Sequence, residues 1–453
     1  MITNSVNTAK SQPALKYLPL VLFYTYIILF LSIVFCLRAV SSIAIACILA
    51  VGITESIVRK SAINPRSGLS LFTLTSTLLF LLQCLSLFYT NDRSEDWKLI
   101  QRSSGLLFIP FGLLLTRNIL STATVRTLLG HFIIILSGGC LYCLVIATIK
   151  FFSGAPSQVF FYHDLVEPVL HHAIQYSILV FIGLVWLLEN RRGKIVLLPA
   201  SMSALTIAFL SVFLILLSSK LIITFFFLYL LLYLLRKKIN RTRIVVMILG
   251  VAVTTVLLVS TQNPVGSRYR SIFAGNILLF TQPSFGPGVY FNGAQFRLLE
   301  WRFTYEILNE QKAWLLGLTP GDAQSFLDRK YHETNMYTGV PGTEKRGFLG
   351  YHTHNQFLQS LLENGLLGLA IFAWICCTML IMAQQGKSNE LKWIIGLLIA
   401  YCFTDAPFQT QYGIIIFTLF PCLVFLSSVR NAPQQSTLER QHPELLNNEK
   451  QPN

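Results

Sequence analysis

Residues 351–365 read YHTHNQFLQSLLENG and place two histidines, an asparagine and a carboxylate where a polar segment meets an apolar run. Histidine titrates near neutral pH, so it can act as a general base toward a hydroxyl group. Asn355, Gln359 and Glu363 recur every four residues, which stacks them on one face of a helix. A polar stripe entering lipid is costly unless it faces protein or a cavity, so it indicates a functional site. The alternative is an ordinary amphipathic helix start that Asn355 caps.

Several cations are of the type that binds phosphate. Arginine offers a planar, bidentate and permanently charged group, which suits a diphosphate. The polar segment before residue 351 contains several such arginines, among them Arg268, Arg270, Arg297, Arg302 and Arg329, and Lys220 ends a Ser-Ser-Lys sequence in front of an apolar run. The alternative for Arg268, Arg302 and Arg329 is a solvated or lipid-facing charge, and the residues alone do not rank Arg297 above the others. The alternative for Lys220 is a side chain that extends from a helix end toward the membrane surface.

A third polar group, with His171 and His172, precedes another apolar run and follows His163 and Asp164. Such a group can bind a metal, but neither a Cys nor a Glu-x-x-His spacing accompanies it. We therefore expect these side chains to form a polar pocket wall. We expect no metal site and no cofactor in this protein.

The composition indicates which elements must position these residues. The chain has 453 residues, of which 53% are hydrophobic and only 12% are charged. Soluble proteins carry about 25% charged residues, so these values predict an all-α polytopic membrane protein. The net charge of +15 is spread over short loops instead of one soluble face, which argues against a nucleic acid partner. All nine cysteines lie in apolar stretches, so we expect no disulfide framework.

A bilayer core of about 30 Å requires roughly 20 apolar residues per helix. By this criterion the sequence predicts twelve transmembrane helices. They lie near residues 17–36, 39–57, 69–89, 105–116, 127–149, 169–189, 195–217, 220–235, 244–260, 355–384, 391–405 and 412–428.

Lysine and arginine in the short loops predict the orientation of these helices. Basic residues follow the second, fourth, sixth, eighth and tenth spans, for example Arg59, Arg117, Arg191, Arg236 and Lys387. These loops share one side of the membrane, which the positive-inside rule makes cytoplasmic, together with both termini. The segment 261–353 and the shorter loops 90–104, 150–168 and 406–411 then lie outside the cytoplasmic membrane. Lys220 also falls on that outer side, where positive charge is disfavoured, which favours a phosphate-binding role.

The predicted organisation has four parts. Residues 1–260 contain spans one to nine, 261–353 form a large outer loop, 354–430 contain the last three spans, and 431–453 form a polar, disordered cytoplasmic tail. In the loop, apolar residues at 298, 301, 305 and 308 have helical spacing and predict an amphipathic helix on or near the membrane. A turn at 314–322 leads into a second short helix over 322–331. No ATP is available outside, so chemistry there needs an activated substrate.

Residues 354–369, HNQFLQSLLENGLLGL, resemble the signature of the O-antigen ligase and polymerase superfamily. In that family a His-Asn or His-Ser pair and a Glu-x-Gly-x-x-Gly ending open the span after the large periplasmic loop. Arg297 and Trp301 resemble its Arg-x-x-x-Trp element, and residues 316–321 its glycine-containing turn. The layout of spans around one dominant loop is similar along most of the chain. The chain departs from the family at Lys220, where an arginine is usual, and at His171 and His172, where an Asn-rich pattern is commoner.

The resemblance implies a metal-independent glycosyltransferase of GT-C-like architecture in the bacterial inner membrane. Its donor is a glycan on undecaprenyl diphosphate at the outer leaflet. By this resemblance His354 is the base or orients the acceptor, and Arg297 and Lys220 bind the diphosphate with help from Arg268 or Arg270. The supporting positions are Asn355, Gln359, Glu363, His171, His172 and Trp301, with Glu363 in a structural or histidine-orienting role.

The acceptor separates two activities within the superfamily. A ligase transfers the finished glycan to lipid A–core, and this is the preferred interpretation. A polymerase transfers it to a second lipid-linked repeat unit, which remains the main alternative. Protein glycosylation and a lipid-linked glycan flippase or another transporter are further alternatives. Transporters usually place ionisable residues at mid-membrane, whereas these spans contain few beyond Glu363 and Asp405.

Overall fold

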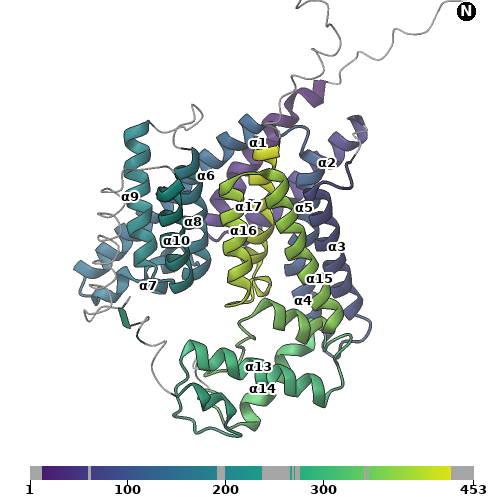
Figure 1. The fold of residues 1–453 in the computed structure, drawn as a ribbon, viewed down its shortest axis with the longest axis vertical. Coiled ribbons are helices and arrows are strands. Elements are labelled where there is room, and N and C mark those ends of the chain that lie inside the picture. The colour runs from purple at the N-terminus through teal and green to yellow at the C-terminus, as the bar shows by residue number, and fades with distance from the viewer. Residues whose placement is uncertain are drawn as a thin grey trace, which may run out of the picture.

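The computed structural model describes residues 13–59, 63–190, 199–236, 266–267, 270, 276–340, 343 and 346–429. The regular structure in these ranges is helical (Figure 1). The α-helices are α1 Pro13–Val34, α2 Arg38–Arg59, α3 Gly68–Ser86, α4 Arg93–Ser103, α5 Gly105–Thr116, α6 Thr122–Phe152, α7 Tyr162–Val166, α8 Ala173–Asn190, α9 Ala200–Leu216, α10 Lys220–Arg236, α13 Gly293–Glu310, α14 Pro320–Glu333, α15 Gln356–Gly386, α16 Asn389–Cys402 and α17 Gln411–Val429. Four 3-10 helices are η1 Ser157–Phe160, η2 Glu167–Val169, η3 Ile277–Thr281 and η4 Pro407–Gln409.

Eight helical segments are long and apolar enough to cross a bilayer, which confirms a multi-pass membrane protein. They include α1, α2, α3, α6, α8, α15 and α17, and the eighth joins α4 to α5 over Arg93–Thr116. The shorter helices α9, α10 and α16 coincide with three further predicted spans. The predicted span 244–260 and the predicted tail 431–453 lie outside the described residues. A count of twelve spans, with GT-C-like architecture, therefore remains a prediction.

One predicted loop is mostly helical. The sequence analysis placed residues 90–104 in an outer loop, but α4 occupies most of it and continues almost directly into α5. Asp92 caps α4 by accepting a hydrogen bond from the Glu95 backbone N–H. A search for apolar runs does not detect this continuous helical segment, because α4 is polar and only α5 is apolar.

Two hydrophobic cores hold the molecule together. The larger one lies among the spans, where α6, α8 and α17 contribute fully buried residues such as Phe132, Phe181 and Phe420. The smaller one joins α13 and α14 to the start of α15 through Phe303, Leu327 and Leu362. In Figure 1, α13 and α14 lie together at one end of the bundle, opposite the end where α1 begins. The predicted outer loop thus has a core of its own, in the residues described.

Helix α13 confirms that the predicted segment is helical, and its core face is formed mostly by residues outside the predicted apolar stripe. Asn292 and Gln295 form a capping box at its N-terminus. The buried apolar residues include Phe296, Leu299 and Phe303, whereas Trp301 is 43% exposed. Of the predicted stripe, Leu308 is buried, whereas Trp301 and Tyr305 are exposed, so contact of this face with the membrane stays a prediction. α13 has apolar residues around most of its circumference, and the packing against α14 and α15 selects which of them are buried.

Helix α15 is interrupted at Gly365, which has φ 63° and ψ −162°. The segment 314–319 fits against this break. Leu318 and Thr319 donate backbone hydrogen bonds to the carbonyls of Leu362 and Glu363, at 2.9 and 2.8 Å. In return, Leu366 donates to the Trp314 carbonyl at 2.8 Å. These hydrogen bonds at the glycine motif connect α15 to the predicted outer loop, whose described part (residues 276–353 with α13 and α14) is called the loop domain below.

We expect Gly365→Ala to destabilise the protein by roughly 3 kcal/mol, because only glycine adopts this backbone conformation without strain. A Cβ atom there would also lie 2.3 Å from the Leu315 carbonyl oxygen. Thermal denaturation of the purified protein in detergent measures the effect. Gly138→Ala is the matched control, since a Cβ at that helical position meets no atom within 4 Å. Equal melting temperatures for the two variants would contradict this account of the motif.

Candidate functional site

A cavity of about 480 Å³ lies where the loop domain meets the bundle. Its walls come from the segment before α8, the start of α10, the first turns of α13, the segment before α15 and the segment after α16. The lining residues are Tyr162, His163, His172, Ile174, Gln175, Lys220, Tyr290, Gly293, Arg297, Tyr351, His352, His354, Tyr401, Asp405, Ala406 and Thr410. Three of the residues predicted to act in catalysis or diphosphate binding, Lys220, Arg297 and His354, are thus brought together, and the supporting residue His172 lines the same cavity.

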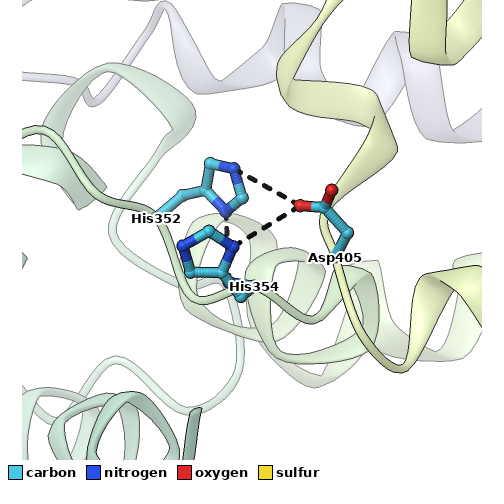
Figure 2. A group of neighbouring side chains, drawn as sticks. All are labelled: His352, His354 and Asp405. Atoms are coloured by element: carbon cyan, nitrogen blue, oxygen red, sulfur yellow. Dashed lines mark hydrogen bonds and ion pairs between the residues drawn. The ribbon is translucent and has the colours of Figure 1, made fainter. Parts of the chain in front are cut away.

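Two histidines and an aspartate form the most compact group in this cavity (Figure 2). Asp405 Oδ1 lies 3.6 Å from His352 Nε2 and 3.6 Å from His354 Nδ1. The backbone N–H of His354 donates to His352 Nδ1 at 3.1 Å. His354 has φ 47°, an uncommon conformation for a residue other than glycine. Both rings are directed toward the same carboxylate (Figure 2).

The contacts assign different roles to the two rings. Neutral His352 accepts a hydrogen bond at Nδ1, so its proton is on Nε2 and faces Asp405. His354 directs Nδ1 toward Asp405. A carboxylate at Nδ1 favours the tautomer whose Nε2 lone pair is available to accept a proton. His354 Nε2 is therefore the better placed base.

Burial lowers the pKa of His352 to about 4, and the neighbouring His354 lowers it further, against the opposing effect of Asp405. His352 is consequently neutral at neutral pH. Asp405 lies beyond the end of α16. Burial raises the pKa of its carboxyl, but the contacts with His354 and His352 and the hydrogen bond that Tyr401 donates at 2.8 Å hold that pKa well below its usual range. The aspartate is ionised and can stabilise a positive charge that forms on His354.

Arg297 approaches the same carboxylate from α13. Its Nε donates to the Thr404 carbonyl at 3.0 Å, and its Nη1 donates to the Gly293 carbonyl at 2.8 Å. Burial lowers the pKa of the guanidinium, and Asp405 raises it. Arginine stays charged in proteins and has five N–H donors. The two carbonyls fix its plane, and donors remain for a ligand.

Lys220 is the first residue of α10 and lines the cavity. The serines before it, Ser218 and Ser219, are buried, and Ser218 has φ 53°. This turn ends α9 and directs the chain into α10. The lysine thus belongs to a tight helix junction at the cavity wall.

The polar stripe of α15 faces protein, as its cost in lipid requires. Asn355 caps the helix by accepting from the Phe357 and Leu358 N–H groups. Gln359 Nε2 donates to Glu363 at 2.7 Å, and Gln409 Nε2 donates to the same oxygen at 2.6 Å. Glu363 contacts these two amides, whereas the carboxylate beside His354 is Asp405. Of the two roles predicted for Glu363, these contacts favour the structural role over the orientation of His354.

The remaining predicted residues are dispersed. His172 lines the cavity, and its ring lies 4.5 Å from that of His163. His171 is buried, and its Nε2 lies 3.1 Å from the Ile33 carbonyl oxygen. Trp301, one turn after Arg297, does not line the cavity, and neither does Arg270. Arg268 lies outside the described residues.

Sequence reasoning missed Asp405 as a site residue. Its signal was present, because it is one of the few ionisable residues within the predicted spans. Its partners lie on another segment, which no local pattern reveals. Within the described residues, His352, His354 and Asp405 also form a group that can hold a metal ion, since their ligand atoms lie within 4.8 Å of one another. The sequence analysis considered only the group around His163, Asp164 and His171 for this purpose.

Comparison with known families gives one match. A family model described as O-antigen ligase matches residues 204–373, a range that contains Lys220, Arg297 and His354. No curated protein matches the chain.

Proposed function

Since the match assigns residues 204–373 to the O-antigen ligase family, we propose that the protein is a membrane glycosyltransferase of the ligase type. It transfers a glycan from undecaprenyl diphosphate to lipid A–core at the periplasmic face of the bacterial inner membrane. One observation carries the proposal: Lys220, Arg297 and His354 come from three separate segments and line one cavity with Asp405.

The cavity contains the groups that such a transfer needs. A diphosphate is a good leaving group if cations stabilise the charge that develops on it. Arg297 and Lys220 supply two positive charges at the wall of this cavity. His354 Nε2 supplies a base, and Asp405 orients it.

The proposed reaction is a single displacement. The acceptor hydroxyl oxygen attacks the anomeric carbon of the donor sugar, and its proton passes to His354 Nε2. The bond between the anomeric carbon and the diphosphate oxygen breaks, and its electron pair remains on the diphosphate. Arg297 and Lys220 bind this product. The imidazolium that forms on His354 is stabilised by Asp405 until the proton leaves.

A polymerase that extends lipid-linked repeat units is the alternative, since it uses the same donor and the same groups. Deletion of the gene followed by a lipopolysaccharide gel separates the two. Loss of a ligase leaves bare core and accumulated lipid-linked polymer, whereas loss of a polymerase leaves core that carries one unit. A normal lipopolysaccharide ladder in the deletion strain would contradict both, and would favour protein glycosylation or transport.

The proposed orientation places the loop domain in the periplasm and both termini in the cytoplasm. We expect Gln311→Cys in a cysteine-free background to react with a membrane-impermeant thiol reagent in intact spheroplasts. Gln311 follows α13 and is exposed. Lys387→Cys, exposed between α15 and α16, is the control and should react only after permeabilisation. The reverse pattern would overturn the orientation.

We expect the transfer to be independent of metals, with the charge of the leaving group balanced by Arg297 and Lys220. EDTA should therefore leave the rate of the purified enzyme with lipid-linked donor unchanged. The matched measurement adds one divalent metal after chelation. Inhibition by EDTA that this metal reverses would mean that His352, His354 and Asp405 bind an ion during catalysis.

A further inference from the structure

A second cavity, of about 510 Å³, adjoins the first one and differs from it in charge. It lies between the start of α2, helix α4 and the segment that joins η4 to α17. Its lining residues are Cys36, Arg38, Ser42, Lys98, Gln101, Arg102, Leu170, His171, His172, Gln175, Gln409, Thr410, Gln411 and Tyr412. Three of these residues, Arg38, Lys98 and Arg102, are basic, and the lining contains no Asp or Glu. Lys98 also pairs with Glu95 at 3.0 Å, so the two arginines supply the net positive charge. Arg38 also lies at the N-terminus of α2, where the helix dipole adds positive potential. The cavity suits an anion.

This cationic cavity continues into an apolar groove of about 350 Å³. Ser42, Gln101, Arg102 and Gln411 line both spaces. The groove follows one face of α2, through Ile45, Leu49 and Ile53, and Phe108 of α5 closes its other side. Ala46, Ala50 and Gly105 keep it open, because their side chains are small or absent. A cationic end followed by an apolar channel matches a lipid with an anionic head group.

The second cavity is connected to the catalytic one. His172, Gln175 and Thr410 line both cavities. Gln175 Nε2 donates to Thr410 Oγ1 at 2.6 Å across their boundary. Arg102 Nη1 donates to the Gln409 carbonyl at 2.7 Å, and the Gln409 amide in turn binds Glu363 of α15. A lipid head group beside Arg102 therefore lies next to the cavity that contains His354.

We propose that the Arg38–Lys98–Arg102 cavity binds a phosphate of the acceptor lipid, and that the α2–α5 groove holds one of its hydrocarbon chains. This inference rests on the proposed function. Arg297 and Lys220 are proposed to bind the donor diphosphate, so the phosphate of the acceptor needs cationic contacts of its own. Both lipid A–core and a lipid-linked repeat unit carry phosphate and hydrocarbon chains. In the proposed orientation these cations lie on the periplasmic side. The positive-inside rule, which explains basic residues on the cytoplasmic side, therefore does not explain them.

Steady-state kinetics of the full-length protein in nanodiscs test the head-group contact. We expect Arg38→Gln and Lys98→Gln each to raise the KM for lipid A–core by about tenfold to a hundredfold, the range for one charge-assisted contact. The KM for the lipid-linked donor should stay unchanged. Both side chains are exposed, so their loss leaves the fold intact. Arg93→Gln is the matched control, since Arg93 is an exposed cation of α4 that does not line the cavity.

A second pair of variants tests the groove. Ala46→Phe should fill it and raise the acceptor KM, because Ala46 is exposed toward the groove and has no core contact to disturb. Ile43→Phe, at a 64% exposed position of α2 outside the groove, should leave the acceptor KM unchanged. An increase in the donor KM instead would identify the groove as the site of the polyprenyl chain and overturn the proposal. An unchanged acceptor KM in both Arg38→Gln and Ala46→Phe would also overturn it.

Direct binding separates this inference from the proposed function. Native mass spectrometry of the purified chain with lipid A–core should show a complex that Arg38→Gln and Ala46→Phe each weaken and Ile43→Phe does not. If no donor supports transfer but this binding pattern holds, the proposed function fails and the lipid site stands. If Arg38→Gln weakens inorganic diphosphate binding while lipid A–core binding is unaffected by every variant, the cavity is an anion site only and the lipid proposal fails.

Discussion

His354→Ala is expected to lower the rate of glycan transfer by roughly 10²–10⁴-fold, the usual contribution of a general base. In His354, Nδ1 faces Asp405 and Nε2 can accept a proton, whereas Nδ1 of His352 already accepts a hydrogen bond. The variant therefore removes the proposed proton acceptor. His354 is 25% exposed at a cavity wall, so truncation removes little packing. The rate with lipid-linked donor and purified enzyme measures the effect, with protein abundance and melting temperature measured in parallel.

Two further variants make this prediction specific. His352→Ala should cost much less, because His352 accepts the His354 backbone N–H and its other nitrogen faces Asp405. Asp405→Asn keeps the shape but removes the charge that orients His354 and stabilises its protonated form, so it should lower kcat with little change in donor KM. Activity close to normal in folded His354→Ala protein would exclude the proposed base. A larger loss in His352→Ala would exchange the two roles.

Arg297→Lys is expected to lower the rate by about ten- to a hundredfold, although it preserves the positive charge. A lysine ammonium cannot keep both carbonyl contacts, to Thr404 and Gly293, while it presents further donors to the diphosphate. The lost contact is made to the leaving group, so the effect should appear in kcat as well as in kcat/KM.

Lys220→Arg provides the reciprocal comparison at the other cation. We expect this variant to remain active, because arginine preserves the charge and adds a bidentate contact. Lys220→Gln should lose activity, since it removes the charge but keeps most of the side-chain length. Wild-type transfer by Arg297→Ala protein at normal abundance would remove Arg297 from the site. Equal losses in Lys220→Arg and Lys220→Gln would remove the charge of Lys220 from the mechanism.

Much of the architecture was predictable from local sequence. Apolar runs of sufficient length placed eleven predicted spans on helices of the structure, and the twelfth lies outside the described residues. The position of Asn355 correctly predicted the start of α15, because a capping side chain acts within a single turn. The polar stripe through Gln359 and Glu363 was also confirmed, since helical periodicity alone puts both residues on one face. These features depend on interactions between near neighbours in the chain.

The tertiary structure decided how the site is assembled. Asp405 joins the histidines from a segment after α16, and Arg297 of α13 lines the same cavity. The buried face of α13 and the break at Gly365 likewise depend on what packs against them. The sequence determined which residues could do the chemistry and which helices carry them. It could not determine which of these residues meet, because the contact energies that select one packing arrangement arise between segments far apart in the chain.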